Sequence, residues 1–178
     1  MGVVAGCGGG TGSVKMSLTD APPAIANLKS VNVTIAEVRV HDDASTDSAD
    51  GGSAGSDGDG ADGAGWIVLC TETQTLDLLT LSGGKLAPLC GGKAIEVPAG
   101  NVSQVRLGVI SAQLIFNDGT TSNLTVPSGG QSGLKVDVNQ AVPKGGTLEV
   151  KLDFVANESI VLKGNGTYSL KPVLRVVK

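Results

Sequence analysis

The stretch SAQLIFNDGTTSNLTVP, residues 111–127, decides the fold class of this chain. Apolar and polar residues alternate on both sides of Asn117-Asp118-Gly119. An Asp-Gly pair between two such runs is a strong local signal for a β-hairpin. A period of two places successive side chains on opposite faces of a strand. The stretch therefore predicts two antiparallel strands joined by a tight turn.

The same alternation recurs along most of the chain. In SVKMSLTD, residues 13–20, every second residue is apolar, which predicts a strand with one buried face. In VNVTIAEVRV, residues 31–40, the apolar phase changes near Ala36-Glu37, and a β-bulge there would keep both apolar sets on one face. Pro143-Lys144-Gly145-Gly146 separates LKVDVN from TLEVKLDF, which predicts another hairpin.

The pattern as a whole predicts an all-β chain. We count about seven to nine short strands at intervals of roughly 8–12 residues, which is typical of an antiparallel β-sandwich. Aromatic residues make up only 2% of the chain, so its core must be built from Val, Leu and Ile. The β-branched members of this set favour strands over helices.

Residues 42–65, DDASTDSADGGSAGSDGDGADGAG, contain seven Asp and no Lys or Arg. The rest of the chain has ten acidic and thirteen basic residues. The segment is therefore the reason that the net charge of the whole chain is negative, at −4. Alanine is the largest apolar residue in this segment, so it can bury little apolar surface. We therefore expect a disordered insertion between two strands. An acidic chain with few aromatic residues also argues against nucleic-acid binding.

The acidic segment contains DGDGADG, residues 57–63, which resembles calcium-binding loops. Asp57, Asp59 and Asp62 are the candidate ligands, because Ca²⁺ prefers several carboxylate oxygens. Counted from Asp57, however, the fifth residue is Ala61 and the sixth is Asp62, which does not fit the EF-hand pattern. We therefore expect no cofactor, with Ca²⁺ at these three residues as the alternative.

The N-terminal stretch VVAGCGGGTGS, residues 3–13, indicates where in the cell the protein is located. Val4-Ala5-Gly6-Cys7 looks like a bacterial lipobox, in which Cys7 would be lipidated and anchored in a membrane. Residues 1–11 are then a lipobox remnant and glycine-rich tether, and residues 12–178 one β-sandwich domain. Only six residues precede Cys7, so we expect the rest of a signal peptide upstream of Met1. The alternative is an ordinary cysteine in a disordered N-terminus.

The chain has three cysteines, an odd number. If Cys7 is lipidated, Cys70 and Cys90 remain, and outside the cytoplasm such a pair tends to form a disulfide. The alternative is two separate buried thiols. No CxxC motif is present, so a metal site at these cysteines has little support.

Catalytic residues are scarce in this sequence. His41 is the only histidine, beside Asp42 and Asp43 at a predicted strand end, and we interpret it as a solvated position. We therefore predict that the chain is not an enzyme. Trp66 is a weak candidate for ligand binding, and a core position is the favoured interpretation for it.

Six stretches together resemble the domain of unknown function 4382 family: SVKMSLTDAP (13–22), LDLLTL (76–81), VPAGNVSQVRL (97–107), LTVPSGGQSGLKV (124–136), LDF (152–154) and GNGTYSLKPVLRV (164–176). The resemblance implies a secreted bacterial or archaeal protein, often a lipoprotein. It also implies an immunoglobulin- or transthyretin-like sandwich, for which a carbohydrate-binding-like role has been considered.

Two functions are compatible with these observations. The first is a non-enzymatic lipoprotein domain of the cell envelope, outer membrane or cell surface, which binds polysaccharide or protein through one end of the sandwich. The second is a structural subunit of an envelope or extracellular assembly, which pairs with its neighbours through edge strands. A patch that includes Trp66 or clustered polar side chains would favour the first, and an unprotected edge strand the second.

Overall fold

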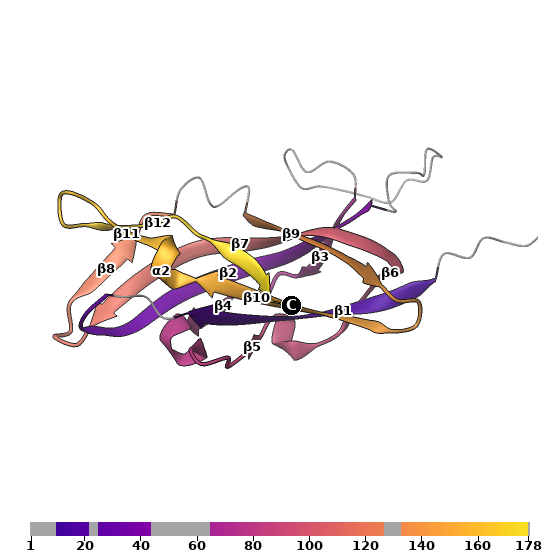
Figure 1. Ribbon diagram of the computed structural model, residues 1–178, viewed down its shortest axis with the longest axis horizontal. Coiled ribbons are helices and arrows are strands. Elements are labelled where there is room, and N and C mark those ends of the chain that lie inside the picture. Colours follow the sequence, from indigo (N-terminus) through magenta and orange to yellow (C-terminus); the bar gives the residue numbers. More distant parts are fainter. Residues whose placement is uncertain (1–9, 22–24, 44–64, 127–132, 178) are drawn as a thin grey trace, which may run out of the picture.

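The computed structural model describes residues 10–21, 25–43, 65–126 and 133–177. It is an all-β, sandwich-like fold of two open sheets and a small hairpin (Figure 1). Cys7, Asp57, Asp59, Asp62 and most of the acidic segment lie outside the described residues. Within the ranges given above, no helix is long and apolar enough to cross a membrane.

The first sheet, called here the β1 sheet, has β1 (Thr11–Ala21) at its centre. On one side β1 pairs with β10 (Thr147–Val155), which pairs with β13 (Leu174–Val177). On its other side β1 pairs with two short strands, β5 (Ala87–Pro88) and β6 (Ile95–Pro98).

The second sheet, the β2 sheet, is built on the long pair β2 (Leu28–Asp42) and β7 (Gly100–Phe116). β3 (Trp66–Cys70) and β4 (Gln74–Asp77) pair with β2. β8 (Thr121–Leu124) and β9 (Leu134–Val142) pair with β7.

The remaining elements are short. β11 (Ile160–Leu162) and β12 (Tyr168–Leu170) form a separate hairpin. A single helical turn, α2 (Ala156–Ser159), precedes this hairpin. Two 3-10 turns, η2 (Leu78–Leu81) and η3 (Cys90–Gly92), follow β4 and β5.

The inward faces of the two sheets form one hydrophobic core, as the period of two predicts. β1 contributes Val14, Met16 and Leu18, and β10 contributes Phe154, the largest side chain that is fully buried. The residues of both apolar phases of β2 are buried together: Val31, Val33, Ile35, Val38 and Val40.

The predicted bulge in β2 is confirmed. Ile35 pairs with Val109 and Glu37 pairs with Gly108, so Ala36 has no partner of its own on β7. The extra residue turns the strand, so that Val38 and Val40 face the core like Ile35.

The predicted hairpin at Asn117-Asp118-Gly119 is also confirmed. The Phe116 amide donates to the Thr120 carbonyl at 2.9 Å, and the Gly119 amide donates to the Phe116 carbonyl at 3.0 Å. Gly119 has φ +85°, a conformation that glycine adopts without steric strain. Asp118 Oδ1 accepts from the amide and the hydroxyl of Thr120, which closes the turn.

The hairpin predicted at Pro143–Gly146 is wrong. β9 before this turn pairs with β7, and β10 after it pairs with β1, so the turn carries the chain from one sheet to the other. Its backbone bonds to β1 instead: the Gly145 amide donates to the Thr11 carbonyl and the Ser13 amide to the Gly146 carbonyl.

One strand pair departs from the antiparallel pattern. β1 and β10 are parallel over nine residue pairs, from Ser13–Thr147 to Ala21–Val155, whereas the other pairs of described strands are antiparallel. A parallel pair needs a long connection, and here the whole β2 sheet lies within it.

The described residues form thirteen strands, more than the predicted number of about seven to nine. The C-terminal run is divided into β12 and β13 around Pro172, because proline has no amide hydrogen for a ladder. Residues 74–98 contribute three further strands of two to four residues each.

The predicted disulfide is confirmed: Cys70 and Cys90 are bonded, with their Cα atoms 5.6 Å apart. Cys70 ends β3 of the β2 sheet, and Cys90 begins η3, just after β5 of the β1 sheet. The bond therefore joins the two sheets along one side of the sandwich.

We expect replacement of residues 44–64 by Asn-Gly to leave the melting temperature within a few degrees of wild type, with or without Ca²⁺. The Asp42 amide already donates to the Gly65 carbonyl at 2.9 Å, and His41 pairs with Trp66 beyond it. Shortening the loop also changes its closure entropy by only about 0.6 kcal/mol per halving. Thermal denaturation followed by circular dichroism tests this. A large loss of stability, or a Ca²⁺-dependent increase in the intact chain alone, would contradict it.

Candidate functional site

The outer face of the β2 sheet carries an open row of neutral polar side chains. In β2 the side chains of Val33 and Ile35 enter the core, so Asn32 and Thr34 point away from it. Across the strands, Thr34 pairs with Thr75 of β4 and Ser111 of β7, and Asn32 pairs with Gln113 of β7. Gln113 in turn pairs with Asn123 of β8.

Two hydrogen-bonded pairs organise this surface. The hydroxyl oxygens of Thr34 and Thr75 lie 2.9 Å apart, and Gln113 Nε2 donates to Asn123 Oδ1 at 3.0 Å. These bonds link β4 to β2 and β8 to β7, and they hold the side chains in defined positions on a rigid sheet.

Between these pairs the face is hollowed into a groove of about 570 Å³. Asn32, Thr34, Thr75, Ser111, Gln113 and Asn123 line it, and Ile110 forms its exposed apolar part. Among the described residues that line the groove, none is charged or aromatic. Its volume is comparable to that of small-molecule sites, although it is more open and more polar than most of them.

Ile110 reaches this surface through a second bulge, opposite the one at Ala36. Thr34 pairs with Ser111 and Ile35 with Val109, so Ile110 lies between two paired residues. Its side chain remains 53% exposed, although isoleucine is normally buried. Bulges often re-aim a side chain next to a functional site.

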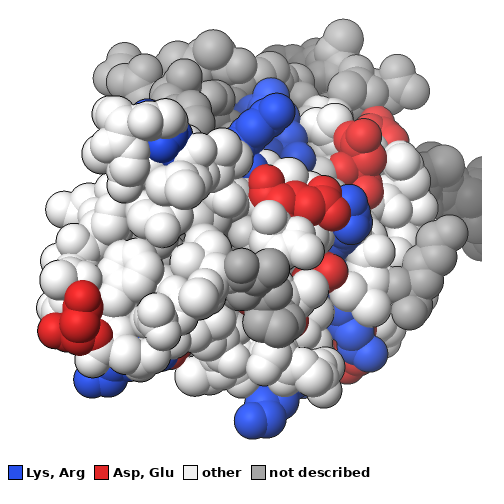
Figure 2. All heavy atoms as spheres, turned by 60° about the vertical axis from the view of Figure 1, so that its left-hand side comes forward, with Lys and Arg blue, Asp and Glu red and all other residues white. Residues whose placement is uncertain are grey.

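The groove lies toward the end of the molecule that is opposite the start of β1. β1 begins at the right-hand end in Figure 1, whereas the β7–β8 and β11–β12 hairpins are at the left. Figure 2 brings that left-hand end forward and shows a broad uncharged surface, with many of the Lys, Arg, Asp and Glu side chains gathered toward the upper right of the view.

The other end of the same outer face has a different character. Trp66 is half-buried there, with the Arg106 guanidinium 4.2 Å from the centre of its ring and the edge of His41 against it at 5.1 Å between centroids. Trp66 is not part of the hydrophobic core, so the favoured interpretation of it as a core residue is wrong. One reason is that its cross-strand partner His41 also points outward.

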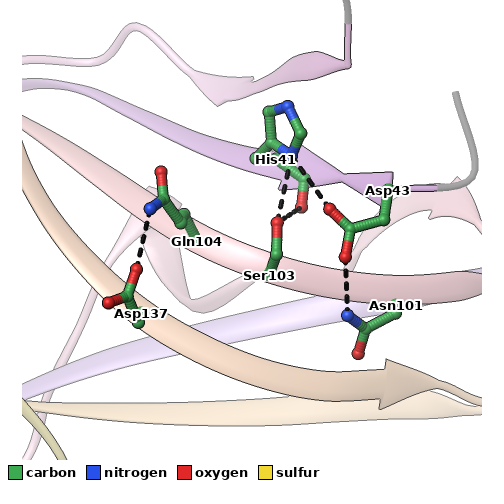
Figure 3. Close-up of polar contacts among 6 residues, drawn as sticks. All are labelled: His41, Asp43, Asn101, Ser103, Gln104 and Asp137. Carbon is green, nitrogen blue, oxygen red and sulfur yellow. Dashed lines mark hydrogen bonds and ion pairs between the residues drawn. The ribbon is translucent and has the colours of Figure 1, made fainter. Parts of the chain in front are cut away.

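His41, Ser103 and Asp43 are close together at this end, but they do not form a catalytic relay (Figure 3). Ser103 Oγ is 3.0 Å and Asp43 Oδ1 3.3 Å from the same ring nitrogen, His41 Nδ1. A serine–histidine–aspartate triad requires the hydroxyl and the carboxylate on different nitrogens. Hydrogen bonds from Asn101 and Ser103 hold the pKa of Asp43 below its usual range, so it is an ionised surface carboxylate.

Metal ligands are not gathered in the part of the chain that the structure describes, where no three His, Cys, Asp or Glu side chains come together. The proposed calcium ligands Asp57, Asp59 and Asp62 lie outside it.

The groove was not predicted from the sequence, although a signal for it exists. Val105, Leu107 and Val109 are buried in one phase, and Ala112 and Leu114 are buried in the other. This change of phase marks the bulge at Ile110 in the same way that the phase change in β2 marked Ala36.

The fold and this surface define a class: a β-sandwich protein that exposes one sheet face with a neutral polar groove. A family model supports a more specific assignment. The model of DUF4382, described as a domain of unknown function, matches residues 11–172, and the chain belongs to this family. No curated protein and no solved structure matches the chain, and the immunoglobulin- or transthyretin-like detail of the fold stays a prediction.

Proposed function

We propose that this chain is a non-enzymatic, surface-displayed lipoprotein domain of the cell envelope that binds polysaccharide or protein on the outer face of its β2 sheet. The neutral groove around Ile110 is the observation that carries the proposal. Ile110 lies exposed beside the hydrogen-bonded hydroxyl and amide pairs of the groove, and a ligand in the groove would contact both kinds of group.

The position of the groove supports display. Cys7 precedes Thr11, the first residue of β1, by only four residues. A lipid on Cys7 would hold the β1 end of the sandwich at the membrane. The groove reaches from the middle of β2 to β8 and so lies away from that end, in a position where a ligand outside the membrane would meet it.

The edge strands support the structural alternative less well. β3, β4, β5, β6, β8 and β13 have two to five residues each, and β5 contains Pro88. The longer edge strand β9 exposes Lys135 and Asp137. Short strands, proline and charged side chains are the usual means of preventing edge-to-edge pairing.

The proposal is tested in cells that express the full-length gene. Wild-type protein should incorporate labelled palmitate, and cells that display it should adhere to immobilised polysaccharide or extracellular protein. Cells with the Cys7→Ala variant should show neither property. Equal label in the two strains would contradict the anchor. If the protein is lipidated but the cells bind neither polysaccharide nor extracellular protein, the binding function is contradicted.

A further inference from the structure

We infer that the groove around Ile110 is a subsite for one unit of a neutral polysaccharide. This inference rests on the proposed function and deepens it, because it names the class of ligand and the residues that contact it.

The two polar pairs provide the hydrogen-bonding groups that a sugar requires. In the Gln113–Asn123 pair one amide group donates to the other, which leaves one carbonyl oxygen and one amino group outside the bond. In the Thr34–Thr75 pair, the hydroxyl that accepts still has its own hydrogen to donate. Neighbouring sugar hydroxyls both donate and accept, so they match such mixed groups.

Ile110 provides the apolar part of the site. A sugar ring has a face of C–H groups between its hydroxyls, and this face needs an apolar surface to exclude water. The side chain of Ile110 is 53% exposed in the middle of the polar groove, held there by a bulge in a long central strand. A platform in the backbone of a sheet is more rigid than one in a loop.

The charge of the groove favours a neutral ligand. The described lining residues carry no Lys, Arg or His that could pair with a carboxylate or sulfate group. Removing an ionised group from water without an opposite charge is strongly unfavourable. A lipid surface is also a poor match, because most of the exposed lining consists of hydroxyl and amide side chains.

The test uses the full chain carrying Cys7→Ala and a panel of immobilised neutral polysaccharides, acidic polysaccharides and extracellular proteins, with binding measured at low and high salt. We expect retention on a neutral polysaccharide with little dependence on salt, because no charges are paired. Gln113→Ala and Ile110→Ser should each weaken the affinity about tenfold, since roughly 1.4 kcal/mol corresponds to that factor.

Two matched variants are the controls. Gln104→Ala removes another half-buried glutamine of β7, which bonds Asp137 at the far end of the same face. Val68→Ser removes another exposed apolar side chain of this sheet, 46% exposed. Both should bind like the parent chain. Circular dichroism and melting temperature establish that all four variants are folded.

The outcomes separate the site from the function. Loss of binding in Gln104→Ala but not in Gln113→Ala or Ile110→Ser would overturn the groove as the site and leave the binding function intact. Binding to acidic polysaccharides alone, or to a protein ligand alone, would contradict the inference that the ligand is a neutral polysaccharide. Absence of binding to any polysaccharide or protein would overturn the function and the inference together.

Discussion

Replacing both disulfide cysteines, as Cys70→Ser with Cys90→Ala, is expected to lower the free energy of unfolding by about 3 kcal/mol and the melting temperature by roughly 6–12 °C. The bond closes a loop between residues 20 positions apart and joins β3 of one sheet to the turn after β5 of the other. Without it, the unfolded chain gains conformational freedom. Alanine is chosen at position 90 because that side chain is buried, and a serine there would leave a buried hydroxyl.

Urea denaturation of the oxidised chain and of the double variant measures this effect. Reduction with dithiothreitol should bring wild type to the stability of the double variant and leave the double variant unchanged. Equal stability of oxidised wild type and the variant would show that the bond adds nothing to the native fold.

Asp20→Asn is expected to stabilise the protein by the largest amount at pH 8 and by a smaller amount at pH 5. Asp20 ends the buried phase of β1, is only 4% exposed, and accepts the Ala156 amide on Oδ1 at 3.0 Å. Its other oxygen has no hydrogen-bond partner among the described residues. Burial, with a smaller contribution from the charge of Asp153, raises the pKa of Asp20 to about 7.

The direction of the pH effect follows from proton binding. Between the pKa of an unfolded aspartate, about 3.9, and the folded value, the native state keeps a proton that the unfolded state releases. Stability therefore falls as the pH rises through this window. Asparagine keeps the acceptor for Ala156 and cannot ionise, so the gain at pH 8 should reach a few kcal/mol, at about 1.4 kcal/mol per pKa unit.

Urea denaturation at pH 5 and pH 8 measures the effect of this substitution. Asp118→Asn is the control, because Asp118 is exposed and hydrogen bonds from Thr120 lower its pKa instead. The same decrease of stability with pH in wild type and in Asp20→Asn would contradict the assignment to Asp20.

The sequence predicts which face of the sheet a residue lies on better than it predicts which strand lies beside it. Alternation placed Val14, Met16 and Leu18 in the core, and a change of phase located the bulge at Ala36. Alternation carries no information about partners. The parallel pairing of β1 with β10 and the crossing of the chain at Pro143 were therefore not predicted.

The candidate site was harder to predict for a related reason. Trp66 was the weak candidate for ligand binding named from the sequence, yet Arg106 already stacks on it. The groove is formed by Thr, Asn and Gln side chains from four strands, residue types that occur on any solvated sheet face. They become a site only when the register brings them together around Ile110.

The pairing of β1 with β10 also limits the order in which the sheets of the protein can form. The first strand of the chain must wait for residues 147–155, and its other neighbours come from residues 87–98. Until then Val14, Met16 and Leu18 remain exposed on a nascent chain. Contacts between residues so distant in sequence also form slowly. The β1 sheet can therefore be completed only when residues 147–155 are available, and a chain that ends before β10 leaves β1 without its longest partner.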